Sequence, residues 1–138
     1  MISSPYKRAI QSIELLAHAK RLKVDIDARL SERVLSSKLL DDWYEKLKLS
    51  FSDMNIVFEG GESSQEAMYR IVQALNERMN SDEDHILFVT HGNIMSLLLK
   101  HFDSAIGFTE WQNFSNPDVY VLKYHSADHV EIERIWEC

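Results

Sequence analysis

Residues 86–93 read ILFVTHGN, an apolar run of strand formers that ends at a threonine, a histidine and a glycine. A continuous apolar run, without alternating polar residues, is typical of a parallel strand that is covered on both faces. Gly92 then turns the chain, and apolar residues at helical spacing from Ile94 to Phe102 predict a helix. His91 is therefore expected at the carboxyl end of a buried strand, the edge where open α/β sheets bind their ligands.

This strand-to-helix junction offers chemistry that suits a phosphate group. The start of the helix is expected to present free backbone N–H groups and the positive end of the helix dipole. His91 can donate a hydrogen bond to phosphate or transfer protons near neutral pH. The alternative is a histidine whose hydrogen bonds are satisfied within a turn, and this segment alone leaves both interpretations open.

Three further helices are predicted from apolar spacing, and strand patterns separate them. Ser4 and Pro5 suit the N-cap and the first position of one helix, and Ser63 with Glu66 forms a capping box for another. The three apolar faces consist of Tyr6, Ile10, Ile13 and Ala17; of Leu39, Leu40, Trp43 and Leu47; and of Met68, Ile71, Val72, Leu75 and Met79.

The remaining segments complete an α/β pattern. They are a short strand through Val24, Ile26 and Ala28, a loop at 30–37, a short helix at 108–114, and a terminal hairpin formed by strands at 119–124 and 130–136. Because strands and helices alternate up to this hairpin, we expect a single domain over residues 1–138. Its expected fold is a three-layer α/β/α sandwich with a mainly parallel sheet.

Composition narrows the classes of function. The chain has 138 residues and a formal net charge of -7, which argues against a nucleic-acid partner, since Lys and Arg supply most of the affinity for phosphate backbones. We find no signal peptide and no apolar stretch near the roughly 20 residues of a membrane span. The single cysteine, Cys138, permits no intrachain disulfide, and we expect a reduced thiol in a cytoplasmic protein. No metal site is predicted, since His125 and His129 would form one only by chance geometry.

Two charged residues outside the strand-to-helix junction are candidates for a phosphate site. Arg8 lies in the first turn of its predicted helix, where the helix dipole disfavours a cation, so a phosphate partner would explain its position. Glu32 follows a predicted strand in a loop and could act as a general acid for a leaving group. For each of them the alternative is a solvated surface side chain.

Four short segments occur in one order along the chain: SSPYKRA at 3–9, LSE at 30–32, GES at 61–63 and VTHGN at 89–93. This ordered set resembles the histidine phosphatase superfamily, in the branch that includes cofactor-dependent phosphoglycerate mutases and broad phosphatases. The resemblance covers nearly the whole chain. It implies a phosphoglycerate-mutase-like fold, a small phosphorylated substrate, a covalent phosphohistidine intermediate, and no metal or other cofactor.

The resemblance also implies roles for individual residues. His91 would be the second pocket histidine, in contact with the phosphoryl group, and Glu32 would stand where the family keeps its proton donor. Glu62 would shape the loop before the third helix, and Asn93 would lie on the pocket rim. The implied phosphate-binding residues are Arg8, His91, Gly92 and Asn93.

The chain departs from the family pattern in two places. The family begins with a strand that ends in an R-H-G motif, whose histidine attacks phosphorus, and no R-H-G triplet occurs in these 138 residues. We therefore expect the sheet to lack its first central strand. After Glu32 the chain reads VLSS at 34–37, where family members often have a glycine and an aromatic residue.

Three interpretations stay open on the sequence alone. The chain is a weak or inactive phosphatase, a phosphate-binding pseudoenzyme, or a truncated form of an ordinary phosphatase. Without the central strand, which the family places beside the strand that ends at His91, two strands face a gap or must pair directly. Because unpaired strand edges associate with other chains, we expect a homodimer through the exposed sheet or a rearranged sheet.

Overall fold

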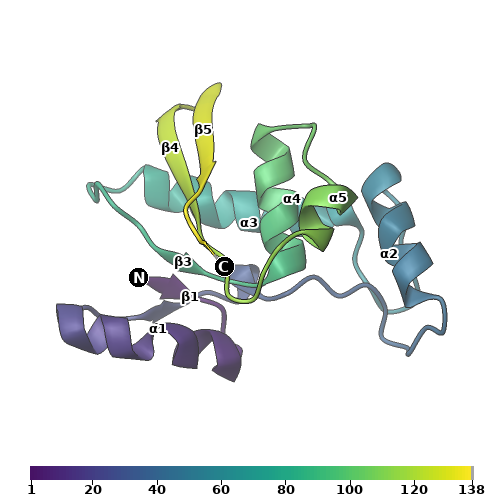
Figure 1. The fold of residues 1–138 in the computed structure, drawn as a ribbon, viewed down its shortest axis with the longest axis horizontal. Helices are drawn as coiled ribbons and strands as arrows, with labels where there is room; N and C mark the ends of the chain where they lie inside the picture. Colours follow the sequence, from purple (N-terminus) through teal and green to yellow (C-terminus); the bar gives the residue numbers. More distant parts are fainter. Residues whose placement is uncertain (138) are drawn as a thin grey trace.

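The computed structural model describes residues 1–137, so the expectation for the Cys138 thiol lies outside the described residues. Figure 1 shows the arrangement of the elements. The helices are α1 (Lys7–Lys20), the 3-10 helix η1 (Ala28–Leu30), α2 (Trp43–Ser52), α3 (Ser64–Met79), α4 (Gly92–Phe102) and α5 (Phe108–Gln112). The strands are β1 (Ile2–Ser3), β2 (Asp25–Ile26), β3 (Phe88–Val89), β4 (Tyr120–Ser126) and β5 (His129–Arg134).

A small parallel sheet organises the first two-thirds of the chain. Its strand order is β2-β1-β3, and Ile2 of β1 is paired with Asp25 on one side and with Phe88 on the other. Helix α1 lies on one side of this sheet and α3 on the other (Figure 1). The predicted α/β class with a parallel sheet is confirmed. Strand β1 was not predicted, because two residues before a helix are too few to show a period.

The C-terminal hairpin forms a second sheet. Strands β4 and β5 pair only with each other within residues 1–137, and the hairpin projects from the molecule (Figure 1). Strand β3 pairs with β1 alone in the same part of the chain, so its other edge is open. This arrangement agrees with the expectation that the strand ending at His91 faces a gap.

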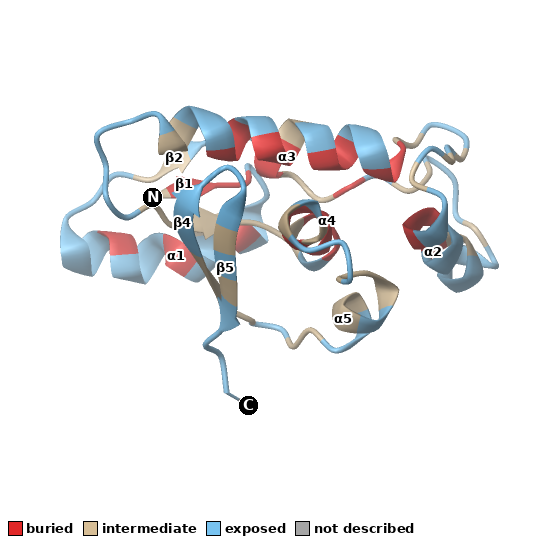
Figure 2. Cartoon of the chain, turned by 90° about the horizontal axis from the view of Figure 1, so that it is seen from above, coloured by how far each residue is buried: buried red, intermediate tan, exposed pale blue. Residues whose placement is uncertain are grey.

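The main core lies between α3 and α4, with α2 packed at one end. Its buried residues are Leu47, Phe51, Ala67, Met68, Ile71, Val72, Leu75, Ile94, Leu97 and Leu98. The buried stripes on α3 and α4 are visible in Figure 2. The predicted apolar faces of these two helices are confirmed, because a period of three and four residues places one stripe against a neighbour. Burial of each large aliphatic side chain stabilises the fold by about 2 kcal/mol.

Two helix starts differ from the predictions. Helix α1 begins at Lys7 with Tyr6 as its N-cap residue, and the Ser4 hydroxyl instead accepts the Tyr6 backbone N–H at 3.2 Å. Helix α2 begins at Trp43, whereas Leu39 is fully exposed outside it. The stripe of Leu39, Leu40, Trp43 and Leu47 was therefore wrong, since α2 buries Leu47, Ser50 and Phe51.

Other boundaries agree closely with the expectations. The Ser63 hydroxyl accepts the Glu66 backbone N–H at 3.0 Å, which confirms the predicted N-cap of α3. The short helix and the hairpin form where they were predicted, although the second hairpin strand ends at Arg134 rather than at residue 136. No helix within residues 1–137 is both long and apolar enough to cross a membrane.

Candidate functional site

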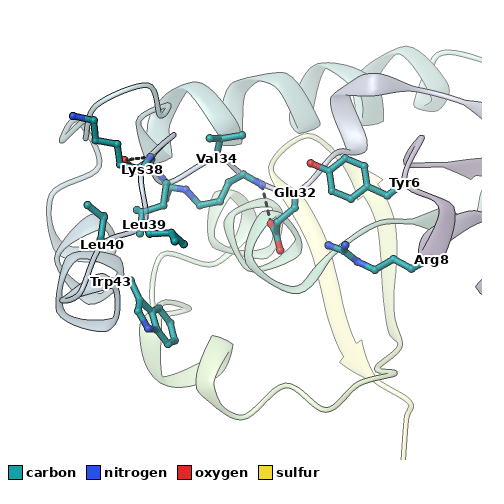
Figure 3. A pocket seen from close by; sticks show the side chains of 11 residues that line it. Tyr6, Arg8, Glu32, Val34, Lys38, Leu39, Leu40 and Trp43 are labelled. Carbon is teal, nitrogen blue, oxygen red and sulfur yellow. Dashed lines mark hydrogen bonds between the residues drawn. The ribbon is translucent and has the colours of Figure 1, made fainter.

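An open pocket of about 430 Å³ lies beside the start of α1. Side chains of two segments, at 6–8 and 32–43, line it, and Figure 3 shows Arg8 pointing across it toward Glu32. Its lining includes Tyr6, Arg8, Glu32, Arg33, Val34, Leu39, Leu40 and Trp43. The pocket thus combines a cation and a carboxylate with an apolar wall.

His91 adjoins the pocket as the N-cap residue of α4, directly after β3. Its ring packs against the Tyr6 ring with centroids 4.7 Å apart, and its Nε2 atom lies 2.8 Å from the Ser4 hydroxyl oxygen. Burial, followed by the positive charges of Arg8 and Arg70, lowers the pKa of His91 to about 4. His91 is therefore neutral at pH 7, and its Nε2 atom can accept the Ser4 hydroxyl proton.

The pair of Ser4 and His91 has the form of a nucleophile beside a base. However, Ser4 is fully buried, with 0% of its surface exposed. Its hydroxyl also accepts the Tyr6 N–H, which fixes its direction. A substrate phosphorus atom cannot reach this oxygen in line, so the pair positions the His91 ring.

Arg8 is exposed, and its guanidinium carbon lies 5.0 Å from the centroid of the Tyr6 ring. Among the described residues Arg8 makes no ion pair, so its charge is free for an anion. Tyr6 contacts both Arg8 and His91. The structure therefore brings together these two predicted site residues, which are far apart in the sequence.

Glu32 occupies the position where a free helix N-terminus was expected. Its two carboxylate oxygens accept the backbone N–H groups of Asn93 at 3.1 Å and Ile94 at 2.8 Å. One of the same oxygens accepts the Arg33 backbone N–H at 2.8 Å. The expectation of free N–H groups at the start of α4 was thus wrong in this state, because an anion from the same chain already satisfies the helix dipole.

Asn93 lies elsewhere than the resemblance implied, and the implied phosphate-binding role of Gly92 stays a prediction. Asn93 is buried in the first turn of α4 rather than on the pocket rim, and its side-chain oxygen has no hydrogen-bond partner among the described residues. Gly92 is the first residue of α4. A Cβ atom there would meet Phe114 at 3.8 Å and Trp111 at 4.0 Å, which are ordinary contacts, so neighbouring atoms do not require a glycine.

Glu62 is held by an arginine that the sequence did not single out. Arg70 donates from Nη2 and Nε to the two Glu62 carboxylate oxygens, at 2.7 and 3.1 Å. Burial alone would raise the pKa of Glu62, but the hydrogen bonds from Arg70 and from the Val34 N–H hold it below its ordinary value. The role of Glu62 in shaping the loop before α3 agrees with this geometry.

Two arginines support the loop that carries Glu32. Arg70 also donates to the backbone carbonyls of Arg29 at 2.6 Å and Glu32 at 3.3 Å. Arg33 is buried and donates to the Ser64 hydroxyl at 2.6 Å and to the Glu62 carbonyl at 2.7 Å, and burial lowers its pKa. No local sequence signal identifies either one, because their partners lie up to 41 positions away.

Comparison with models of protein families gives a match over nearly the whole chain. The family model described as "Histidine phosphatase superfamily (branch 1)" matches residues 1–135. A search of curated proteins gives no match. Together with the ordered site residues, the family match places the chain among phosphatase-like proteins.

Solved structures share the fold at low sequence identity. The mycobacterial glucosyl-3-phosphoglycerate phosphatase Rv2419c with inorganic phosphate is similar at a TM-score of 0.75 and 20% identity, over 100% of this chain and 76% of that chain. Bacillus stearothermophilus YhfR is similar at a TM-score of 0.72 and 19% identity, over 96% and 71%. At this identity the likeness shows the fold, which is phosphoglycerate-mutase-like. The family match shows that this chain belongs to the histidine phosphatase superfamily (branch 1).

Proposed function

We propose that this chain binds a small phosphomonoester in the pocket beside α1, with the phosphate between Arg8 and His91. The observation that carries the proposal is an exposed arginine without an ion pair beside a neutral, half-buried histidine. A guanidinium matches the geometry of phosphate oxygens, and an imidazole can add a directed hydrogen bond. Family membership supports the phosphatase-like class of the function.

Binding of a phosphate dianion changes the charge on His91. An opposite charge at hydrogen-bond distance favours the protonated imidazole and opposes the effects of burial and of Arg8. His91 therefore takes up a proton when phosphate binds and donates a hydrogen bond to it. In the free protein the Ser4 hydroxyl holds the ring in place at 2.8 Å.

Glu32 takes part in binding by leaving the start of α4. Its carboxylate now accepts the N–H groups of Asn93 and Ile94, which are suited to a phosphate oxygen. We infer that the ligand phosphate replaces this carboxylate and accepts the backbone N–H groups of Asn93 and Ile94, directly after Gly92 at the start of α4. The displaced Glu32 side chain stays in the same pocket, where it can donate a proton to the leaving oxygen.

The apolar wall of the pocket favours an aromatic or aliphatic organic group on the substrate. Leu39, Leu40 and Trp43 line this side, and about half of the Trp43 surface is exposed. Exposed apolar side chains grouped beside polar ones are typical of a binding surface. A phenyl phosphate ester is therefore a suitable test substrate.

We propose that hydrolysis by these 138 residues is weak compared with binding. Phosphoryl transfer through an enzyme intermediate needs a nucleophile in line with phosphorus, and the family places it in an R-H-G triplet that this sequence does not contain. Positioning and charge stabilisation alone give only residual rate. The second candidate function is a phosphate-binding pseudoenzyme, which the burial of Ser4 favours.

The open edge of β3 supports a further proposal, a homodimer through the exposed sheet. Strand β3 pairs with β1 on one side only within the described residues. The unpaired backbone groups on the other side can pair with the same edge of a second copy. Light scattering across a concentration series tests this proposal: a dimer is expected, and a monomer at every concentration would contradict it.

The proposed function is tested by p-nitrophenyl phosphate turnover and by calorimetric titration with inorganic phosphate. We expect Arg8→Ala and His91→Ala each to weaken phosphate binding at least tenfold and to abolish any turnover above blank. Lys7→Ala is the matched control, since it removes a neighbouring charge from the same helix turn. Equal phosphate affinity in the Arg8 variant and the control would reject the proposed site.

A further inference from the structure

A group of metal-ligating side chains lies on the projecting hairpin, at the end that joins β4 to β5 (Figure 1). His125 belongs to β4, and His129 and Glu131 belong to β5. The ligand atoms of these three residues all lie within 4.8 Å of one another. None of the three lines the pocket beside α1, so the group is separate from the proposed phosphate site.

An irregularity in the hairpin places His125 in this group. Tyr124 pairs with Val130 and Ser126 pairs with His129, so the register shifts between Tyr124 and Ser126 and His125 is the extra residue. A bulge of this kind redirects a side chain. The His125 ring stacks on the His129 ring with centroids 4.5 Å apart, and its Nε2 atom lies 3.0 Å from a Glu131 carboxylate oxygen.

The neighbouring charges leave this carboxylate available. Lys123 pairs with Glu131 across the two strands, but its amine lies 3.6 Å from the Glu133 carboxylate instead. The pKa of Glu131 is held below its ordinary value, chiefly by the hydrogen bond from His125. Glu131 is therefore ionised at neutral pH, and its carboxylate lies 3.0 Å from His125 Nε2.

We propose that His125, His129 and Glu131 form a surface site for a divalent transition-metal ion of the zinc class. Two imidazole nitrogens and one carboxylate oxygen are donors that zinc accepts, at about 2.0 to 2.2 Å from the ion. Ligand atoms around a tetrahedral ion of this size stand about 3.3 Å apart. All three side chains are exposed, so small rotations close the remaining gap without disturbing packing.

The bound ion would take the place of the contact between His125 Nε2 and the Glu131 carboxylate. The three ligands leave a fourth tetrahedral position for water or for a group from another molecule. The ion would also join β4 to β5, and isolated two-stranded hairpins are only marginally stable.

The test is calorimetric titration of the untagged protein with zinc chloride, in a Cys138→Ser background so that the single thiol does not bind zinc. We expect one ion per chain and at least a tenfold loss of affinity in the double variant His125→Ala/His129→Ala. His18→Ala removes an exposed histidine from α1 and serves as the control, with zinc affinity unchanged. Circular dichroism checks that the variants keep their secondary structure.

Two results would overturn the proposal: no zinc binding at the hairpin, or equal affinity in the double variant and the control. Cobalt absorption provides a second readout, since tetrahedral coordination gives strong visible bands that a simple histidine–carboxylate pair does not. Phosphate binding at the pocket is measured separately with the same variants and should not change. Failure of the metal site is thereby distinguished from failure of the proposed function.

Discussion

The pocket region and the C-terminal hairpin hold their charged residues by different means. Around the pocket, Glu32 and Arg70 each make two hydrogen bonds to backbone groups that lie far away in the sequence. Glu62 accepts the Val34 backbone N–H and two bonds from the Arg70 side chain. On the hairpin, the ion pairs of Lys123 with Glu133 and of His125 with Glu131 are single and exposed. The comparison shows that residues of similar type have different surroundings: Glu32 and Arg70 are held by distant backbone groups, whereas these two hairpin pairs are exposed to solvent.

The largest expected difference between the two regions is in packing. Leu97 is fully buried between α3 and α4, whereas Ile132 on β5 is only half-buried. We expect Leu97→Ala to lower the free energy of unfolding by about 3 kcal/mol, because it removes buried methyl groups and leaves a cavity. Ile132→Ala should cost about 1 kcal/mol or less. Urea unfolding measures the loss in each variant, and equal losses would contradict the expected difference in packing.

The second expected difference between the pocket region and the hairpin is the stability that their ion pairs contribute. Arg70→Ala removes two bonds to Glu62 and two bonds to backbone carbonyls. Because it leaves the half-buried Glu62 carboxylate without its arginine partner, we expect a loss of about 2 kcal/mol in the free energy of unfolding. Lys123→Ala on the hairpin breaks an exposed pair and should cost less than about 0.5 kcal/mol. Thermal unfolding of the two variants in parallel tests this ranking.

A third prediction concerns the pocket region, where His91 makes the free energy of unfolding depend on pH. Its pKa is about 4 in the folded protein and is lowered from an ordinary 6.5, so the unfolded chain binds the extra proton first as the pH falls. Stability is therefore fully present above pH 6.5 and is lost as the pH falls toward 4. We expect a loss on the order of 1 to 2 kcal/mol, reduced by solvent screening. In His91→Gln, the free energy of unfolding should depend less on pH across this range. An unchanged pH dependence would show that His91 is not its cause.

The smallest expected effect concerns Glu32. Because its carboxylate competes with a ligand phosphate for the N–H groups of Asn93 and Ile94, we expect Glu32→Ala to raise phosphate affinity about twofold to fivefold. Turnover of phenyl phosphate, whose poor leaving group benefits from protonation, should fall in the same variant because the proposed proton donor is lost. Weaker phosphate binding in Glu32→Ala would show that Glu32 supports the site rather than competing for it.

Patterns that are local in the sequence predicted the fold well. The strand before His91, the stripes of α3 and α4, and the Ser63 cap all depend on neighbours within a few residues, and all are present. Strand β1 was missed because two residues carry no period. The stripe through Leu39 failed because spacing alone does not show where a helix begins.

The roles of the site residues stay predictions, and their contacts were not predicted from the sequence. Arg8 and Glu32 line one pocket, and the His91 ring packs against Tyr6 of the same lining. Occupation of the α4 N-terminus by Glu32 and support of Glu62 by Arg70 depend on residues 61 and 8 positions apart. Such long-range bonds are decided by the folded backbone, so no local pattern predicts them.

Titration of His91 by NMR, with and without inorganic phosphate, tests the central claim most directly. The account predicts a pKa near 4 in the free protein and a clear rise when phosphate saturates the pocket. The rise should be lost in Arg8→Ala and kept in Lys7→Ala. A His91 pKa that does not respond to phosphate, or that responds equally in both variants, would contradict a phosphate site between Arg8 and His91.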